Sequence, residues 1–461
     1  MVAAMRRDAA PLAAEIRATL AIAAPLAGAN LAQMAMQVTN TVMVGHLGAD
    51  ALAAAGLGAA LYWMLLLICQ GVLTAVAPLA AHAIGADDHP AAGRVAGAGL
   101  LLAACFALPV MGLLATLPRM LASLGYAPQL VAEIGRFLHV VLWGAPAALG
   151  FATLRFILVA AFRARIVMVV PLIAIPVNAL IGWTLIFGHL SAPALGIVGA
   201  GCATAAMQWL MLLSIALYIG LTRRRIPISV AVRFGRELSR IVRLGMPIGG
   251  QVALESGLFV TTGVLMGVLG PDALGAHQLV FNVAGVTFMV PLGLGQAATV
   301  RVAFQLGRGA PQAAQRAAFV ALALGVAFMA ASGIVLWTIP RTLIGLYVDL
   351  ADPANGGLVA IAVRLFMIAA IFQVFDGAQV IATGALRGYR DTAVPLLIAA
   401  VGYWAVGFAG GWLLAFPLGF GAVGLWIGLA LGLAVVALAL TLRLQLRTRA
   451  RMRAAPALAA G

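Results

Sequence analysis

The sequence contains very little charge. Only 9% of its 461 residues are Asp, Glu, Lys or Arg, whereas soluble globular domains carry about 25%. Hydrophobic residues make up 64% of the chain, too many to be covered by polar groups in water. The composition therefore excludes a soluble enzyme and a nucleic-acid-binding domain, and it predicts an integral membrane protein.

Lysine is absent, and cysteine is scarce. All 28 basic residues are arginine, and the three cysteines, Cys69, Cys105 and Cys202, each lie within an apolar stretch. Such cysteines favour neither a disulfide framework nor a metal site, and we expect no cofactor. The first apolar run, 19–44, is too long for the core of a signal peptide, so we expect it to be retained as a span.

Twelve apolar stretches are long enough to cross a hydrocarbon core about 30 Å thick as helices. They lie at about 19–44, 52–79, 95–117, 132–160, 166–187, 196–220, 241–268, 274–300, 316–339, 356–385, 392–416 and 421–446. An even number of spans places both termini on the same side. If that side is the cytoplasm, it receives all the arginines except Arg119, Arg136, Arg341 and Arg364, as the positive-inside rule requires.

An internal repeat relates the two halves of the chain. A shift of 222 residues places Pro25 on Pro247, and it aligns the glycines, the Asp and the leucines of 45–52 with those of 267–274. The register resumes later with two or three extra residues. We therefore predict two six-helix lobes in parallel orientation about an axis along the membrane normal, a layout used by alternating-access transporters. The N-terminal lobe is 1–222, the cytoplasmic linker is 223–240, and the C-terminal lobe with its tail is 241–461.

Two of the thirteen acidic residues have no ordinary explanation at a helix end or in a loop. Glu255 lies midway along the seventh span, and Asp376 lies well inside the tenth. A charged carboxylate near the centre of a bilayer costs about 2.5–3.5 kcal/mol on insertion scales. No arginine lies close to them in sequence, and such acids would readily take up a proton or a bare cation. A purely structural hydrogen-bonding role is the alternative.

Helical spacing places other polar groups on the same faces as the two acids. These supporting residues are Gln251, Thr262, Gln379 and Thr383, and their oxygens suit a hard ion such as Na⁺. Phe259, Phe372 and Phe375 add aromatic surface for core packing or for a cation-binding wall. The repeat aligns Glu255 with Gln33 and Asp376 with Ala152, so the acid pair belongs to the C-terminal lobe alone.

These residues resemble the multidrug and toxic compound extrusion family, in particular its NorM-like branch. The resemblance covers nearly the whole chain, and its most specific segment is FQVFDGAQVIATGALRGYRDT, which surrounds Asp376. The other segments that carry it are TNTVMVGHLGADALAAAGLG, LGMPIGGQVALESGLF and LGAHQLVFNV.

The resemblance implies a V-shaped exporter of amphipathic, often cationic drugs. It also implies that Na⁺ or H⁺ binds at the acids matched by Glu255 and Asp376 and drives export. Related proteins commonly carry an aspartate where this sequence has Asn40. Neutral Asn40, Gln33, Gln37 and Asn178 are therefore expected either to line the substrate path or to stabilise helices.

The function expected from the sequence is a cation-coupled multidrug antiporter. We expect a monomer in a bacterial inner membrane, with small-molecule substrates, the lipid bilayer as its surroundings and no catalytic residues. A lipid or glycan-lipid flippase of related fold is an alternative, although such proteins tend to carry cavity charge suited to an anionic headgroup. An intramembrane aspartyl protease is a further alternative, but it would need two catalytic aspartates where this chain offers one.

Overall fold

The computed structural model describes the backbone of residues 12–222 and 234–459, and these residues form helices without any strand. Twelve helical segments of this described part are long and apolar enough to cross a membrane. Each coincides with one of the twelve expected stretches, so the all-α membrane fold and the number of spans are confirmed. Arg6, Arg7 and the linker arginines 223–225 and 233 lie outside the described residues.

The helices form two compact units. The first, here called the N-terminal unit, comprises residues 28–249. The second, the C-terminal unit, comprises residues 250 onward together with the described residues up to 27. Both boundaries fall inside a helix, because α1 is Leu12–Gly45 and α9 is Phe234–Leu269. The division into lobes 1–222 and 241–461 with a linker at 223–240 stays a prediction.

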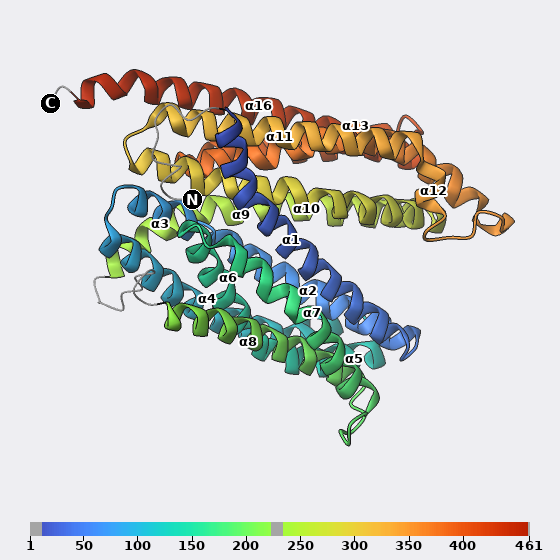
Figure 1. Ribbon diagram of the computed structural model, residues 1–461. Helices are drawn as coiled ribbons and strands as arrows, with labels where there is room; N and C mark the ends of the chain where they lie inside the picture. Colours follow the sequence, from blue (N-terminus) through green and yellow to red (C-terminus); the bar gives the residue numbers. More distant parts are fainter. Residues whose placement is uncertain (1–11, 223–233, 460–461) are drawn as a thin grey trace. The chain divides into compact units, whose positions relative to one another are not determined.

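The N-terminal unit is a helical bundle in which α6 packs against α4 and α8, and α7 also packs against α8 (Figure 1). Two of its spans are interrupted, because α2 continues into α3 and α5 continues through η2 into α6. Its complete helices are α2 (Ala49–Leu73), α3 (Val76–Gly85), α4 (His89–Ser123), α5 (Pro128–Val141), η2 (Leu142–Gly144), α6 (Ala145–Ala160), α7 (Ala164–Phe187) and α8 (Ile197–Leu221).

In the C-terminal unit, α13 packs against α10, α11 and α16 (Figure 1). One span joins α14, the π-helical segment η5 and α15. The helices of this unit are α10 (Pro271–Gly307), α11 (Pro311–Thr338), α12 (Pro340–Ile344), η4 (Pro353–Asn355), α13 (Gly356–Gly388), α14 (Ala393–Ala399), η5 (Ala400–Phe408), α15 (Ala409–Ala415) and α16 (Gly421–Ala459).

Small residues allow the central helices of this unit to approach closely. A Cβ atom added to Gly384 of α13 would lie 2.2 Å from the backbone oxygen of Gly295 in α10. Thr299 fixes the same crossing, because its hydroxyl donates to the Gly384 carbonyl at 2.8 Å. Close backbone contact and interhelical hydrogen bonds are the main sources of helix association in lipid. They hold α13 in a defined position.

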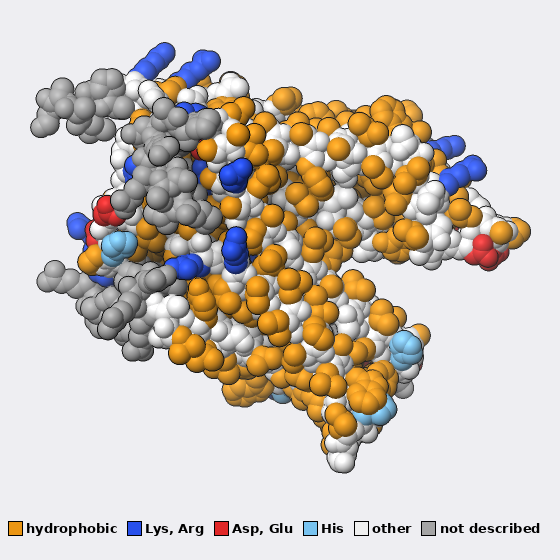
Figure 2. Space-filling model, viewed as in Figure 1, with side chains coloured by type: hydrophobic (Ala, Val, Ile, Leu, Met, Phe, Trp, Pro, Cys, Tyr) orange, Lys and Arg blue, Asp and Glu red, His pale blue; other side chains and the backbone are white. Residues whose placement is uncertain are grey.

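Hydrophobic side chains cover the flanks of the helices on the face shown in Figure 2. Ion pairs join helices elsewhere. Glu15 of α1 pairs with Arg301 of α10, and both are almost completely buried. Glu237 of α9 pairs with Arg94 of α4 at 3.4 Å. Both acids lie in the first turn of their helices, and each also joins its helix to another through an arginine.

Candidate functional site

The two intramembrane acids lie together in the C-terminal unit, although they come from different helices. Glu255 is on α9 and Asp376 is on α13. Gln379, one turn beyond Asp376, donates from Nε2 to Glu255 Oε1 at 2.9 Å and to Asp376 Oδ1 at 3.3 Å. Both carboxylates are thus within hydrogen-bonding distance of one nitrogen atom. A small cation entering here would meet oxygens from both acids.

Tyr403 sets the orientation of the amide. Its hydroxyl is fully buried and donates to Gln379 Oε1 at 2.9 Å. Because the amide oxygen is engaged in this way, the amide NH₂ must face the carboxylates. Tyr403 lies in η5, a π-helical segment of a kind often found at functional sites. We call Glu255, Asp376, Gln379 and Tyr403 the acid site.

The other supporting residues divide into two groups. Gln251 donates from Nε2 to Thr383 Oγ1 at 3.3 Å, so these two residues join α9 to α13 close to the acid site. The hydroxyl of Thr262 instead donates to the Leu258 carbonyl of its own helix at 2.8 Å. Helical spacing had placed Thr262 on the face of Glu255, but the threonine hydroxyl is satisfied by the backbone four residues earlier.

An arginine acts on the acid site electrostatically. Among the described residues neither Glu255 nor Asp376 forms an ion pair. Arg387, near the end of α13, nevertheless interacts with Glu255 through charge, and its Nε is buried without a hydrogen-bond partner in the described structure.

Two of the three phenylalanines, the half-buried Phe259 and the buried Phe372, belong to an aromatic cluster. The rings of Phe259 and Phe372 are 6.3 Å apart, and Phe372 is 5.6 Å from Trp426. Trp426 in turn donates from Nε1 to His277 Nδ1 at 3.2 Å. This arrangement favours core packing for Phe259 and Phe372. Phe375 is half-buried, with no ring contact recorded within the described chain.

The polar residues predicted in the first half of the chain line a cavity of the N-terminal unit. A cavity of about 410 Å³ lies within the N-terminal unit, and its wall includes Gln33, Gln37, Asn40 and Asn178. Asn178 donates from Nδ2 to Asn40 Oδ1 at 2.8 Å. We call this space the polar cavity. Its neutral amides both face the cavity and join α1 to α7, so lining and helix stabilisation are combined.

No group of three or more His, Cys, Asp and Glu side chains that could hold a metal ion occurs in the described part of the chain. The donors at the acid site are carboxylate, amide and hydroxyl oxygens. Oxygen donors of this kind suit a hard cation or a proton.

Twelve apolar helical segments, an acid pair inside the C-terminal unit and a polar cavity inside the N-terminal unit are features of a multi-pass membrane transporter. The MatE family model matches residues 25–184 and again 247–413, and the chain belongs to this family of multidrug and toxic compound extrusion transporters. The two matches begin at Pro25 and Pro247. They therefore follow the repeat found in the sequence.

Named relatives agree with this assignment. The chain is 43% identical over 414 residues to the multidrug resistance protein NorM of Burkholderia vietnamiensis, covering 89% of this chain and 90% of the relative. It is 42% identical over 423 residues to a probable multidrug resistance protein NorM of Burkholderia mallei, covering 89% of this chain and 88% of the relative. The chain is thus a multidrug efflux transporter. These matches favour drug export over the flippase and protease alternatives.

Solved structures share the fold at low sequence identity. An outward-facing multidrug resistance MATE family transporter superposes with a TM-score of 0.88 at 18% identity, over 98% of each chain. The eukaryotic MATE transporter AtDTX14 gives a TM-score of 0.84 at 21% identity, over 96% of this chain and 99% of that one.

Proposed function

We propose that this transporter is an antiporter in which inward flow of Na⁺ or H⁺ drives drug export, and that the acid site carries the coupling cation. The observation that supports this most strongly is the shared amide. Glu255 and Asp376 accept hydrogen bonds from the same nitrogen of Gln379 inside apolar helices. Two carboxylates held this close repel each other when both are ionised, so binding one cation is favourable.

The charge of the acid site would then control which side of the membrane the transporter opens to. With a cation bound, the site is nearer to neutral and costs less to enclose in apolar surroundings. When the cation leaves, the negative pair needs water or another positive group. A ligand shifts a conformational equilibrium only by its difference in affinity for the two states, and this change in charge supplies such a difference.

The remaining parts of the proposal extend what the sequence alone predicts. The substrates are amphipathic, often cationic compounds. The chain works as a monomer in a bacterial inner membrane with both termini in the cytoplasm. It needs neither a cofactor nor catalytic residues, because transport requires only binding and a change of access.

Purified protein in proteoliposomes tests the coupling directly. Efflux of a fluorescent organic cation is recorded with a sodium gradient alone, with a pH gradient alone, and with neither. We expect one gradient to drive efflux above the gradient-free rate, and this gradient identifies the coupling ion. Equal rates under all three conditions would contradict ion coupling, whereas transport of the dye itself would still be seen.

A further inference from the structure

A row of polar side chains runs along α13 from the acid site to the end of the helix. Its members follow one another at intervals of three or four residues, so they lie on one face of the helix. They are Asp376, Gln379, Thr383 and Arg387. On α9, Glu255 contacts Gln379, and Gln251 one turn away contacts Thr383. Arg387 is the last member of the row.

The helices are polar on one side of the acids only. One turn away in the other direction lie Phe372 on α13 and Phe259 on α9, with ring centres 6.3 Å apart. The acid site therefore has aromatic rings on one side and, on the other, the Gln251–Thr383 pair followed by Arg387. Under the proposed topology, Arg387 lies at the cytoplasmic end of α13, where an inward-moving cation leaves.

Arg387 is directed toward the acids. Side chains on an α-helix lean toward its N-terminus, which in α13 is the direction of Thr383 and the acid site. Arg387 follows Gln379 by about 12 Å along the helix axis, and an extended arginine side chain bridges much of that gap. Its charge acts on Glu255 and Tyr403, both members of the acid site.

The charge of Arg387 has no matched partner within the described structure. None of the ion pairs found there includes it, and its Nε is buried without a hydrogen-bond partner. A guanidinium stays charged in proteins, and a buried cation without a partner is costly. The acids of the same row have the opposite need, because they require a positive partner whenever the coupling cation is absent.

We propose that Arg387 is the internal counter-ion of the acid site: it compensates Glu255 and Asp376 when the coupling cation has left, and it opposes that cation while the cation is bound. This inference rests on the proposed function and names a residue that sets the cation affinity of the site. Weaker binding near the cytoplasmic end favours release. Without Arg387 the site should hold its cation more tightly and release it more slowly.

Efflux kinetics of Arg387→Gln test the proposal. Proteoliposomes are loaded with a fluorescent organic cation, and initial efflux rates are recorded at several concentrations of the ion whose gradient drives efflux. For the variant we expect the half-maximal ion concentration to fall about tenfold, as for the loss of one nearby charge in a protein interior. We expect the maximal rate to fall as well. A lower maximal rate with an unchanged half-maximal concentration would show a structural role and overturn the proposal.

Two further variants separate charge from structure. Arg387→Lys keeps the charge, and we expect its half-maximal ion concentration to stay close to that of the wild type. Arg163 occupies the equivalent position in the first half of the repeat, where neutral residues replace both acids. Arg163→Gln should therefore leave the half-maximal concentration unchanged, and a tenfold fall in this variant would contradict a role that depends on the acids.

A positive charge in the last turn of a helix also suits the helix dipole, but that role predicts no change in cation affinity. Dye binding in detergent shows whether each variant is folded. If Arg387→Gln does not bind the dye, Arg387→Met provides the same comparison. Wild-type efflux that responds to neither gradient would contradict the coupling itself. Gradient-driven efflux with wild-type ion affinity in the neutral variant would contradict only the role of Arg387.

Discussion

Gln379 donates a 2.9 Å hydrogen bond to Glu255, a residue 124 positions earlier in the chain and on a different helix. The same nitrogen reaches Asp376 at 3.3 Å. One neutral amide therefore holds two acids that would otherwise be separate intramembrane charges. A cation that displaced this amide from either carboxylate would change hydrogen bonding on both α9 and α13.

Replacing Gln379 tests this arrangement. The Gln379→Leu substitution removes the only hydrogen bond to Glu255 that the described structure records, and leaving a buried acceptor unpaired costs about 1–3 kcal/mol. We expect the thermal midpoint in detergent to fall and gradient-driven efflux to be lost.

Gln373 on the same helix is the matched control. It is equally buried, but it hydrogen-bonds to Ser332, Thr287 and the Met329 carbonyl instead. Gln373→Leu should lower the thermal midpoint by a similar amount while gradient-driven efflux persists. Equal efflux by the two variants would show that the amide at 379 has no special part in coupling.

Tyr403 should act on the acid site through the orientation of Gln379. In Tyr403→Phe the amide oxygen of Gln379 loses its hydrogen-bond donor, and the loss of about one hydrogen bond, about 1 kcal/mol, should weaken cation-driven efflux several-fold. Tyr389→Phe is the control, because the Tyr389 hydroxyl is buried but has no partner among the described residues. Initial efflux rates at several cation concentrations measure the effect. A Tyr403→Phe protein with the apparent cation affinity of Tyr389→Phe would contradict the orienting role.

Glu15 and Glu237 occupy equivalent positions of the repeat but should differ in their contribution to stability. The Glu15–Arg301 pair has side-chain exposures of 9% and 2%, and removing one member of a buried pair costs about 3–5 kcal/mol. Arg94, the partner of Glu237, is 37% exposed, and such pairs contribute about 0–1 kcal/mol. Thermal unfolding of Glu15→Gln and Glu237→Gln should show a much larger decrease for the first. Equal decreases would argue against the buried geometry.

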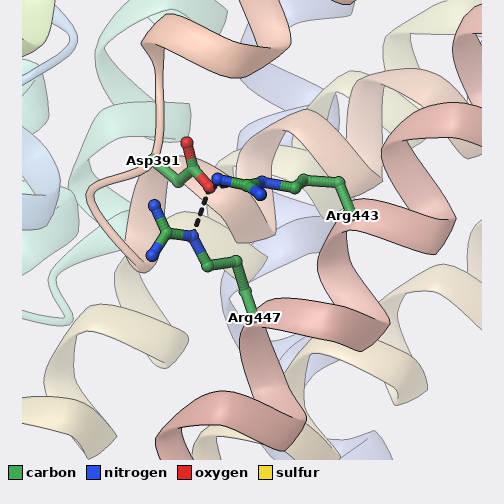
Figure 3. A network of polar contacts seen from close by, with 3 residues as sticks. All are labelled: Asp391, Arg443 and Arg447. Atoms are coloured by element: carbon green, nitrogen blue, oxygen red, sulfur yellow. Dashed lines mark hydrogen bonds and ion pairs between the residues drawn. The ribbon is translucent and has the colours of Figure 1, made fainter.

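Asp391 joins the segment after α13 to α16 through two arginines (Figure 3). Its Oδ2 accepts from Arg443 Nε at 2.9 Å and from Arg447 Nε at 2.5 Å, and the aspartate side chain is only 4% exposed. Asp391→Asn leaves two arginines without their shared anion, and we expect a loss of about 1–3 kcal/mol, limited because both arginines are partly exposed.

Glu133→Gln breaks the exposed pair of Glu133 with Arg136 and serves as the comparison for Asp391. We expect this change to be nearly neutral. Scanning calorimetry at low and high salt compares the two variants. If Asp391→Asn unfolds at the wild-type temperature, the Asp391 network does not contribute to stability.

The sequence predicted the fold well because its signals are local or repeated. Twelve apolar stretches mark the spans, and the shift of 222 residues marks the duplication. Glu255 and Asp376 could be found for a similar reason, since an acid inside an apolar helix is costly wherever its neighbours lie. The amides Gln33 and Asn178 were found as polar residues in otherwise apolar helices.

The partners of these residues could not be predicted, because they depend on contacts between distant helices. Tyr403 is compatible with an ordinary membrane helix, and only its hydrogen bond to Gln379 reveals its role. Arg155 was one of many arginines near a span end, until the structure placed it on the cavity wall. In the sequence Glu15 looks like any acid at a helix N-terminus, and only the structure shows that it pairs with Arg301 of α10.

The most direct test of the account is gradient-driven efflux by the Asp376→Asn variant in proteoliposomes. The amide is close in size to the carboxylate but cannot carry its negative charge. We predict a correctly folded variant that still binds the fluorescent cation, with an efflux rate equal to the gradient-free rate. Efflux at the wild-type rate under the imposed gradient would contradict the central claim that the acid site carries the coupling cation.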